Sequence, residues 1–310
     1  MKPCSTVCSE AGEPLAGSAG NPTLWIGISW PKRLWNPEDA LRSRGLPKGL
    51  EEFVTQAEAE GRKLSLRLFQ RDPDPATERV ELLALRPANG QSLWQRDLPA
   101  SQVPTRLRNF LEEERGDSSL VAGPPQLLVC TDGRHDRCCA EHGAATYRAL
   151  RRQIADQGAP VQIAESSHLG GHRFASTCLV LPEARLYGRL RAEHAPGLLA
   201  AVLSKRVYAS RYRGHLGLEE PRQVAEVFAQ HHSRNAGQVE VGAAVADTDS
   251  GTVRVAVAIR SGSETRKLQV VCGTREFVGA SSCDAEAPTE PRTRWVVVRT
   301  EAGFSGPAAA

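Results

Sequence analysis

Four side chains that can bind a metal follow two apolar segments in the middle of the chain. Cys130 ends the apolar run QLLVC, and Cys139 follows nine positions later. His168 and His172 follow a second apolar run and are separated by Leu-Gly-Gly. If both runs are neighbouring strands, their carboxyl ends lie side by side and the two loops converge. Two thiolates and two imidazoles together are typical of a metal site.

The residue types leave two kinds of metal centre open. Zn²⁺ accepts this set in a tetrahedral arrangement, and a [2Fe–2S] cluster accepts thiolate and imidazole ligands as well. Gly170 and Gly171 let the backbone bend so that both imidazoles face one way, because glycine has no Cβ. The general-base Glu of the zinc-protease sequence HExxH is absent, and the glycine pair disfavours a helix. The plain alternative is buried thiols with hydrogen-bonded core histidines.

The remaining thiols have simpler interpretations. Cys4 and Cys8 lie in an N-terminal segment rich in Gly, Pro, Ser and Ala, which predicts a loose arm with exposed thiols. Their spacing would also suit a metal ligand pair. Cys178 and Cys272 lie in predicted strands and are expected to be buried apolar thiols. Cys283 is expected to be a free thiol on a loop, without an assigned role.

Basic residues surround the candidate ligands. Arg134, Arg137 and Arg173 would favour a more negative reduced state and could dock an acidic redox partner, or they are ordinary solvated side chains. His135 and His142 flank the cysteines, either as supports for the ligands or as surface residues.

The composition indicates an ordinary soluble protein. The chain has 310 residues, enough for one large domain or two smaller ones, with 24% charged and 40% hydrophobic residues. A net charge of +3 is too small to indicate nucleic-acid binding. No apolar run approaches the roughly 20 residues that span a bilayer, and the N-terminus lacks the apolar core of a signal peptide. We therefore expect a cytoplasmic protein without membrane contact, in which thiols stay reduced.

The pattern of apolar residues predicts an α/β protein made of two similar units. In the first unit a strand at 24–30 and a helix at 49–60 precede three strands, at 64–69, 78–86 and 92–98. This order is typical of a small domain of thioredoxin type, although a CxxC is missing. The second unit has a strand at 126–130, a helix at 138–157 that ends at Gly158, a strand at 161–167, a hairpin at 178–190 and helices at 193–205 and 221–232.

Antiparallel strands are predicted at 253–260, 267–273 and 295–300. The expected division is a degenerate thioredoxin-like domain at 1–120, a second thioredoxin-like domain at 121–235 and a β-rich extension at 236–310.

Two long strings resemble the sucrase/ferredoxin-like family. They are VCTDGRHDRCCAEHGAATYRAL and ESSHLGGHRFASTCLVLPEARLYGRL, and the match is close over residues 124–192. The family also contains fungal thioredoxin-like ferredoxins, in which two cysteines and an HxxxH pair ligate a [2Fe–2S] cluster. The resemblance implies Cys130, Cys139, His168 and His172 as the ligands, and the domain at 121–235 as the ferredoxin. Cys138 stands beside Cys139 and could take its place, but the family's nine-residue offset favours Cys139.

The resemblance predicts an electron carrier with proton-coupled one-electron chemistry. Imidazole ligands raise the potential of a [2Fe–2S] centre, from about −400 mV for plant-type ferredoxins to roughly −150 to +300 mV for Rieske centres. An imidazole bound through one nitrogen can still lose a proton from the other. The expected partners are a redox protein and a small acceptor such as a ferric chelate. Sucrase activity is not expected, because no carboxylate pair stands out for glycoside hydrolysis.

Two other functions remain open. A zinc-binding structural or regulatory protein would use the same four residues. A thiol oxidoreductase would use Cys138 or Cys139, but the chain lacks both a CxxC and a visible resolving thiol.

Overall fold

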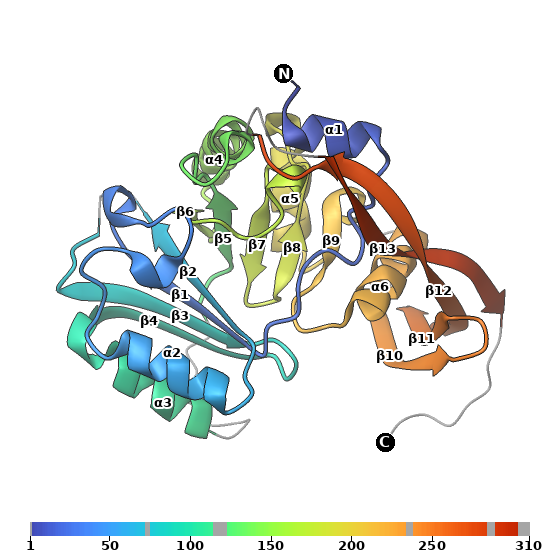
Figure 1. Ribbon diagram of the computed structural model, residues 1–310, viewed down its shortest axis with the longest axis horizontal. Coiled ribbons are helices and arrows are strands. Elements are labelled where there is room, and N and C mark those ends of the chain that lie inside the picture. The colour runs from blue at the N-terminus through green and yellow to red at the C-terminus, as the bar shows by residue number, and fades with distance from the viewer. Residues whose placement is uncertain (1, 72–74, 114–122, 234–237, 284–288, 303–310) are drawn as a thin grey trace.

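A computed structural model describes residues 2–71, 75–113, 123–233, 238–283 and 289–302. The protein is a mixed α/β structure with a curled sheet of nine strands and a separate antiparallel sheet of four strands (Figure 1). The α/β class and the β-rich C-terminal part predicted from the sequence are confirmed. The two predicted domain boundaries, near 120 and 235, lie outside the described residues.

The first half of the large sheet contains four strands and two helices. Its elements are β1 (Leu24–Ser29), α2 (Leu50–Ala59), β2 (Leu64–Gln70), β3 (Arg79–Arg86), β4 (Gln91–Pro99) and α3 (Val103–Glu112). Every residue of β1 is buried, because the strand lies between β2 and β3 while α2 and α3 cover one face of the sheet (Figure 1). The predicted order of strand, helix and three strands is confirmed.

The second half contains five strands and three helices. Its elements are β5 (Gln126–Cys130), α4 (Arg137–Gln157), β6 (Gln162–Ser166), β7 (Cys178–Leu181), β8 (Arg185–Tyr187), α5 (Ala195–Leu203), β9 (Tyr212–His215) and α6 (Glu220–His232). Helix α4 ends at Gly158, which adopts a φ of 55° as predicted for a helix stop. The predicted hairpin is the pair β7–β8.

Strand β9 was not predicted, because its four residues are mostly polar and carry no period-2 signal. Its Arg213 is only 2% exposed, and the guanidinium donates hydrogen bonds to Ser18 Oγ and to the carbonyl of Gly170. The bonds replace the water that a buried cation would lose, so the polar strand can sit at the edge of the core.

The two halves join through β2 and β6, which form a short antiparallel pair. Phe69 lies opposite Ser166 and Gln70 lies opposite Glu165. The backbone N–H of Ser167 donates to the carbonyl of Leu68, and its hydroxyl accepts from the N–H of Leu68. Nine strands thereby form one continuous sheet in the order β4-β3-β1-β2-β6-β5-β7-β8-β9.

The C-terminal sheet packs on α6. Its strands are β10 (Gln238–Asp247), β11 (Thr252–Ser261), β12 (Glu264–Ala280) and β13 (Thr289–Ala302), paired in sequence order. Val224 and Ala225 of α6 pack against Val255 and Val270 of the sheet. The predicted hairpin between 253–260 and 267–273 is confirmed, with longer strands.

The prediction of a loose N-terminal arm is wrong. Residues Cys4–Glu10 form helix α1, which packs against β12 and the segment His172–Phe174 (Figure 1). Both cysteines of α1 are fully buried. Glu13, just beyond the helix, is also buried and accepts hydrogen bonds from Arg173 and Arg294. The Gly- and Pro-rich composition belongs to the residues after α1, so it conceals a short helix that the tertiary contacts stabilise.

Candidate metal centre

Parallel strands β5 and β6 bring the two candidate loops to one edge of the sheet. Cys130, the last residue of β5, lies opposite Ser166, the last residue of β6. The loop to α4 and the HLGGH loop therefore start side by side, as expected from the sequence. Helix α4 begins directly after Asp136, whose side chain caps it by accepting the N–H of Cys138.

Three of the four predicted ligands come together. The donor atoms of Cys130, Cys139 and His168 all lie within 4.8 Å of one another. Cys139 Sγ is 3.8 Å from His168 Nδ1. Each thiol side chain is almost completely buried. The end of a strand, the first turn of a helix and a loop thus supply two sulfurs and one nitrogen to the same small volume.

Hydrogen bonding and burial shift the pKa values of all three donor side chains. A hydrogen bond from the Cys139 thiol lowers the pKa of Cys130 well below its usual range, although burial opposes the change. The same bond and burial raise the pKa of Cys139. The hydrogen bond thus favours the thiolate at Cys130 and the thiol at Cys139. Burial lowers the pKa of His168, so its imidazole is neutral near pH 7 and offers a lone pair.

His172 lies across from this group and is held by a carboxylate. Its Nδ1 is 2.7 Å from Asp136 Oδ2, and its ring centre is 5.8 Å from that of His168. Donation of the Nδ1 proton to Asp136 leaves Nε2 as the atom that can bind a metal. Burial disfavours the ionised form of Asp136, but hydrogen bonds from His172 and from the Cys138 and Cys283 N–H groups hold its pKa far below the usual range.

A third imidazole lies in the same place. The His135 ring stacks on the His168 ring at 3.6 Å and meets the His172 ring edge-on at 5.8 Å. His135 Nδ1 is 2.7 Å from the carbonyl of Pro37, a residue of the first half of the sheet. Of the two roles that the sequence left open for His135, the structure supports contact with the ligands.

The first half of the sheet covers the candidate centre. Arg134 donates to the carbonyl of Lys32, while the Lys32 ammonium binds Thr131 and Glu165. Arg67 of β2 interacts electrostatically with Cys130, and burial lowers its pKa. The loop between β1 and α2 therefore excludes water from one side of the thiols.

The arginines expected to dock a partner differ in their surroundings. Arg173 forms an ion pair with buried Glu13 at 2.9 Å, so its charge is already neutralised locally. Arg137 is exposed. Arg134 is exposed too but donates to the first half of the sheet. Arg137 alone keeps the character of a solvated cation beside the ligands.

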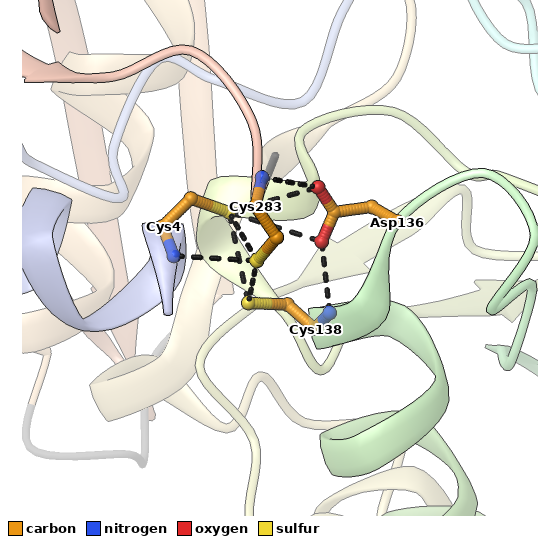
Figure 2. Close-up of side chains that lie close together, drawn as sticks. All are labelled: Cys4, Asp136, Cys138 and Cys283. Atoms are coloured by element: carbon orange, nitrogen blue, oxygen red, sulfur yellow. Dashed lines mark hydrogen bonds between the residues drawn. The ribbon is translucent and has the colours of Figure 1, made fainter. Parts of the chain in front are cut away.

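The other thiols divide into two kinds. Cys178 and Cys272 are fully buried, and burial raises the pKa of each, to about 11 for Cys272, as expected for apolar thiols. Cys138 does not join Cys139, because neighbouring positions of a helix point in different directions. Its Sγ lies 3.0 Å from that of Cys283 and 3.6 Å from that of Cys4 (Figure 2). Cys283 is therefore not an isolated loop thiol.

Sequence reasoning missed Asp136 as the partner of His172 and missed the gathering of Cys4, Cys138 and Cys283. Asp136 had a local signal, since an Asp before a helix of this kind is a typical N-cap. Cys4 and Cys283 had none, because 279 positions separate them along the chain.

Parts of the chain are similar to one curated protein and to two solved structures. A protein of Debaryomyces hansenii, "Altered inheritance of mitochondria protein 32", is 25% identical over 100 residues, which cover 30% of this chain and 37% of the relative. The chain thus matches little more than a third of that protein's length. Two structures of a thioredoxin-like [2Fe–2S] ferredoxin from Aquifex aeolicus are 13% and 14% identical. Each match covers 29% of this chain and 91% or 97% of the ferredoxin, with a TM-score of 0.26.

Within the described residues, no helix has the length and apolar character needed to cross a membrane. The model of the family described as "Sucrase/ferredoxin-like" matches residues 15–214, which is more than half of the chain. The chain therefore belongs to the sucrase/ferredoxin-like family.

Proposed function

We propose that this protein is an electron carrier that binds a [2Fe–2S] cluster through Cys130, Cys139, His168 and His172. One observation carries the proposal: two thiols and an imidazole converge at the ends of two parallel strands, and a second imidazole faces them, held by a buried carboxylate. The family description, which includes ferredoxins, supports the same conclusion.

The donor chemistry fits this cofactor. The hydrogen bond from Cys139 lowers the pKa of Cys130 and so favours its thiolate, the form that binds iron. His168 is neutral and presents Nδ1 toward Cys139, while His172 has Nε2 available. A bound [2Fe–2S] cluster would exchange one electron, at a potential that imidazole ligands raise above that of an all-thiolate site.

Asp136 has a positioning role in this proposal. Its carboxylate fixes the ring of His172 and keeps the proton on Nδ1, so that Nε2 points away from the carboxylate. The proton on Nδ1 of His172 is also the one that can leave when the charge of the centre changes. We therefore expect the midpoint potential to fall as pH rises through the ionisation of a ligand imidazole.

A cavity beside the HLGGH loop supports a small anionic acceptor. It measures about 220 Å³ and is lined by Gly170 and Gly171 together with Arg67, Arg173 and Arg213. The guanidinium groups of Arg67 and Arg213, which form no ion pair within the described residues, would attract an anion such as a negatively charged ferric chelate. Reduced protein should pass electrons faster to an anionic than to a cationic chelate of similar size at low salt. Equal rates would contradict this part of the proposal.

One observation favours a second candidate, a structural or regulatory zinc site at the same residues. The three donor atoms lie within 4.8 Å of one another, which suits a single ion as well as one side of a cluster. The ligands would be the same and the chemistry would differ, since zinc transfers no electrons.

The test is the absorption spectrum of anaerobically purified protein with metal and acid-labile sulfide counted on the same sample. The proposal predicts visible bands with about two irons and two sulfides per chain. A colourless protein without iron, even after anaerobic reconstitution with iron and sulfide, would overturn it. Zinc that is lost in Cys130→Ser would then support the second candidate. Cys178→Ser is the matched control, since Cys178 is equally buried in the same half of the sheet but lies outside the group.

A further inference from the structure

A second group of metal donors lies next to the candidate cluster site, and none of its thiols is a ligand of the proposed cluster. Figure 2 shows Cys4, Asp136, Cys138 and Cys283 pointing toward one another. Cys4 comes from α1, Asp136 and Cys138 from the start of α4, and Cys283 from the segment after β12. Three parts of the chain that are distant in sequence therefore meet at one point.

The distances between the donors suit one ion. The sulfur of Cys283 lies 3.0 Å from that of Cys138 and 3.4 Å from that of Cys4, and the Cys4–Cys138 distance is 3.6 Å. Both oxygens of Asp136 lie 3.9 Å from Cys4 Sγ. Tetrahedral bonds of about 2.3 Å to Zn²⁺ place sulfurs about 3.8 Å apart. Only a small outward movement of the thiols is needed to admit the ion.

The surroundings of the group also suit a bound cation. Cys4 and Cys138 are fully buried, while Cys283 is partly exposed and gives a path from solvent. The backbone N–H of Cys4 points to the sulfur of Cys283 at 3.4 Å, an arrangement that stabilises a thiolate. The carboxylate of Asp136 accepts from the backbone N–H groups of Cys138 and Cys283, which fixes its orientation toward the sulfurs.

We propose that Cys4, Cys138 and Cys283 bind one Zn²⁺ ion, with Asp136 as the fourth donor. Three soft thiolates with a carboxylate are a set that zinc accepts, whereas the carboxylate is a poor ligand for Cu(I). The ion joins α1 and the end of β12 to the helix that carries Cys139. The site is separate from the proposed electron-transfer centre, although Asp136 also holds His172.

The experiment counts zinc in the full-length chain purified under reducing conditions and dialysed against metal-free buffer. We expect about one zinc per chain. Cys283→Ser should bind zinc at least about tenfold more weakly, because it removes a ligand from a partly exposed position that the fold does not need for its core. Its iron and sulfide content should equal that of the parent protein.

Cys8→Ser is the matched control. Cys8 is as buried as Cys4 on the same helix, and its sulfur contacts the carbonyl of Ala280 rather than the group. This variant should keep its zinc. Replacement of zinc by Co²⁺ gives a second readout, since thiolate-to-cobalt charge-transfer bands should appear in the parent and in Cys8→Ser and weaken in Cys283→Ser.

Four results would overturn the proposal. The first is a folded parent protein without zinc that also fails to take up Co²⁺. The second is a zinc content unchanged in Cys283→Ser. The third is zinc lost in Cys130→Ser but kept in Cys283→Ser, which would place the ion at the other site. A Cys138–Cys283 disulfide that persists under reducing conditions, seen as two missing hydrogens by mass spectrometry, would also contradict it. Failure of the proposed function would instead remove iron and sulfide and leave this zinc in place.

Discussion

The two halves of the large sheet repeat one strand order but carry different side chains at the matching strand ends, called here the corner of each half. The first half runs β2-β1-β3-β4 and the second runs β6-β5-β7-β8, each with a parallel pair followed by antiparallel strands. The strand registers make Ser29 the counterpart of Cys130, since each lies at the end of the first strand opposite the second. Phe69 and Ser166 lie opposite these two residues, and two positions further along the chain are Arg71 and His168, which are therefore counterparts too.

In the first half an ion pair fills this corner. Arg71 donates two hydrogen bonds of 2.9 Å to Glu81, and the indole N–H of Trp94 donates to the same carboxylate. Ser29 accepts the backbone N–H of Glu81. The donors of the second half, Cys130 and His168, have no comparable salt bridge within the described residues. One backbone arrangement therefore holds an ion pair in one half and candidate metal ligands in the other, and the side chains decide which.

The largest difference between the halves should be the loss of cofactor on substitution of one thiol. Cys130→Ser should remove most of the visible absorption and iron, because the cluster loses a thiolate and the serine hydroxyl is a poorer ligand. Ser29→Ala, at the matching position of the first half, should keep the full iron content. Iron and sulfide analysis of both variants makes the test, and equal iron in the two would remove the distinction.

Replacement of one imidazole by a thiolate should keep the cofactor and change its potential. His168→Cys should lower the midpoint potential by roughly 200 mV or more, in the direction from Rieske centres toward plant-type ferredoxins. Potentiometric titration at several pH values measures the shift, and the pH dependence should weaken as an ionisable ligand is lost. An unchanged potential would show that His168 does not bind the cluster.

Disruption of the ion pair in the first half should affect stability and leave the cofactor in place. Arg71→Ala leaves the Glu81 carboxylate, at 11% side-chain exposure, without a cation and should cost about 3 kcal/mol of unfolding free energy. Arg79→Ala removes an exposed pair with Asp97 and should have no measurable effect. Denaturant unfolding compares the two, and iron content should be normal in both. Loss of iron in Arg71→Ala would mean that the corners are coupled.

Asp136 connects the ligand histidine to the second thiol group. Asp136→Asn should weaken binding of the cluster about 10- to 100-fold, as expected when the partner of a ligand imidazole is changed.

The low pKa of the Asp136 carboxyl also predicts an effect of this residue on stability. The ionised carboxylate stabilises the fold above about pH 4, and this contribution is lost as the pH falls further. The variant should therefore show less acid destabilisation than the parent in unfolding experiments between pH 6 and about pH 3.

The smallest effect should come from a positive charge in the first half, which acts on the midpoint potential of the centre in the second half. Arg67→Gln removes a cation that interacts with Cys130 and should lower the midpoint potential by about 20–60 mV, since 59 mV is tenfold for one electron. Lys63→Gln removes an exposed charge directly before the same strand and should leave the potential unchanged. Equal potentials in both variants would show that the first half provides cover without electrostatic influence.

Local patterns in the sequence predicted much of this arrangement. The apolar runs ending at Cys130 and before His168 specify parallel strands, so the convergence of their loops could be foreseen. Helix α4 was predictable from its periodicity and from Gly158. Contacts between distant segments were not. The burial of Cys4 depends on β12, and the ion pair of Arg173 depends on Glu13, 160 positions away. Neither relation leaves a periodic signal in the sequence.

The central claim is that two histidines of the second half bind the cluster. It is tested most directly by pulsed electron paramagnetic resonance of reduced protein labelled with ¹⁵N-histidine. The account predicts two strongly coupled imidazole nitrogens, one lost in His168→Cys and the other in His172→Cys. A paramagnetic cluster without strongly coupled histidine nitrogen would contradict the account and assign the iron to other ligands.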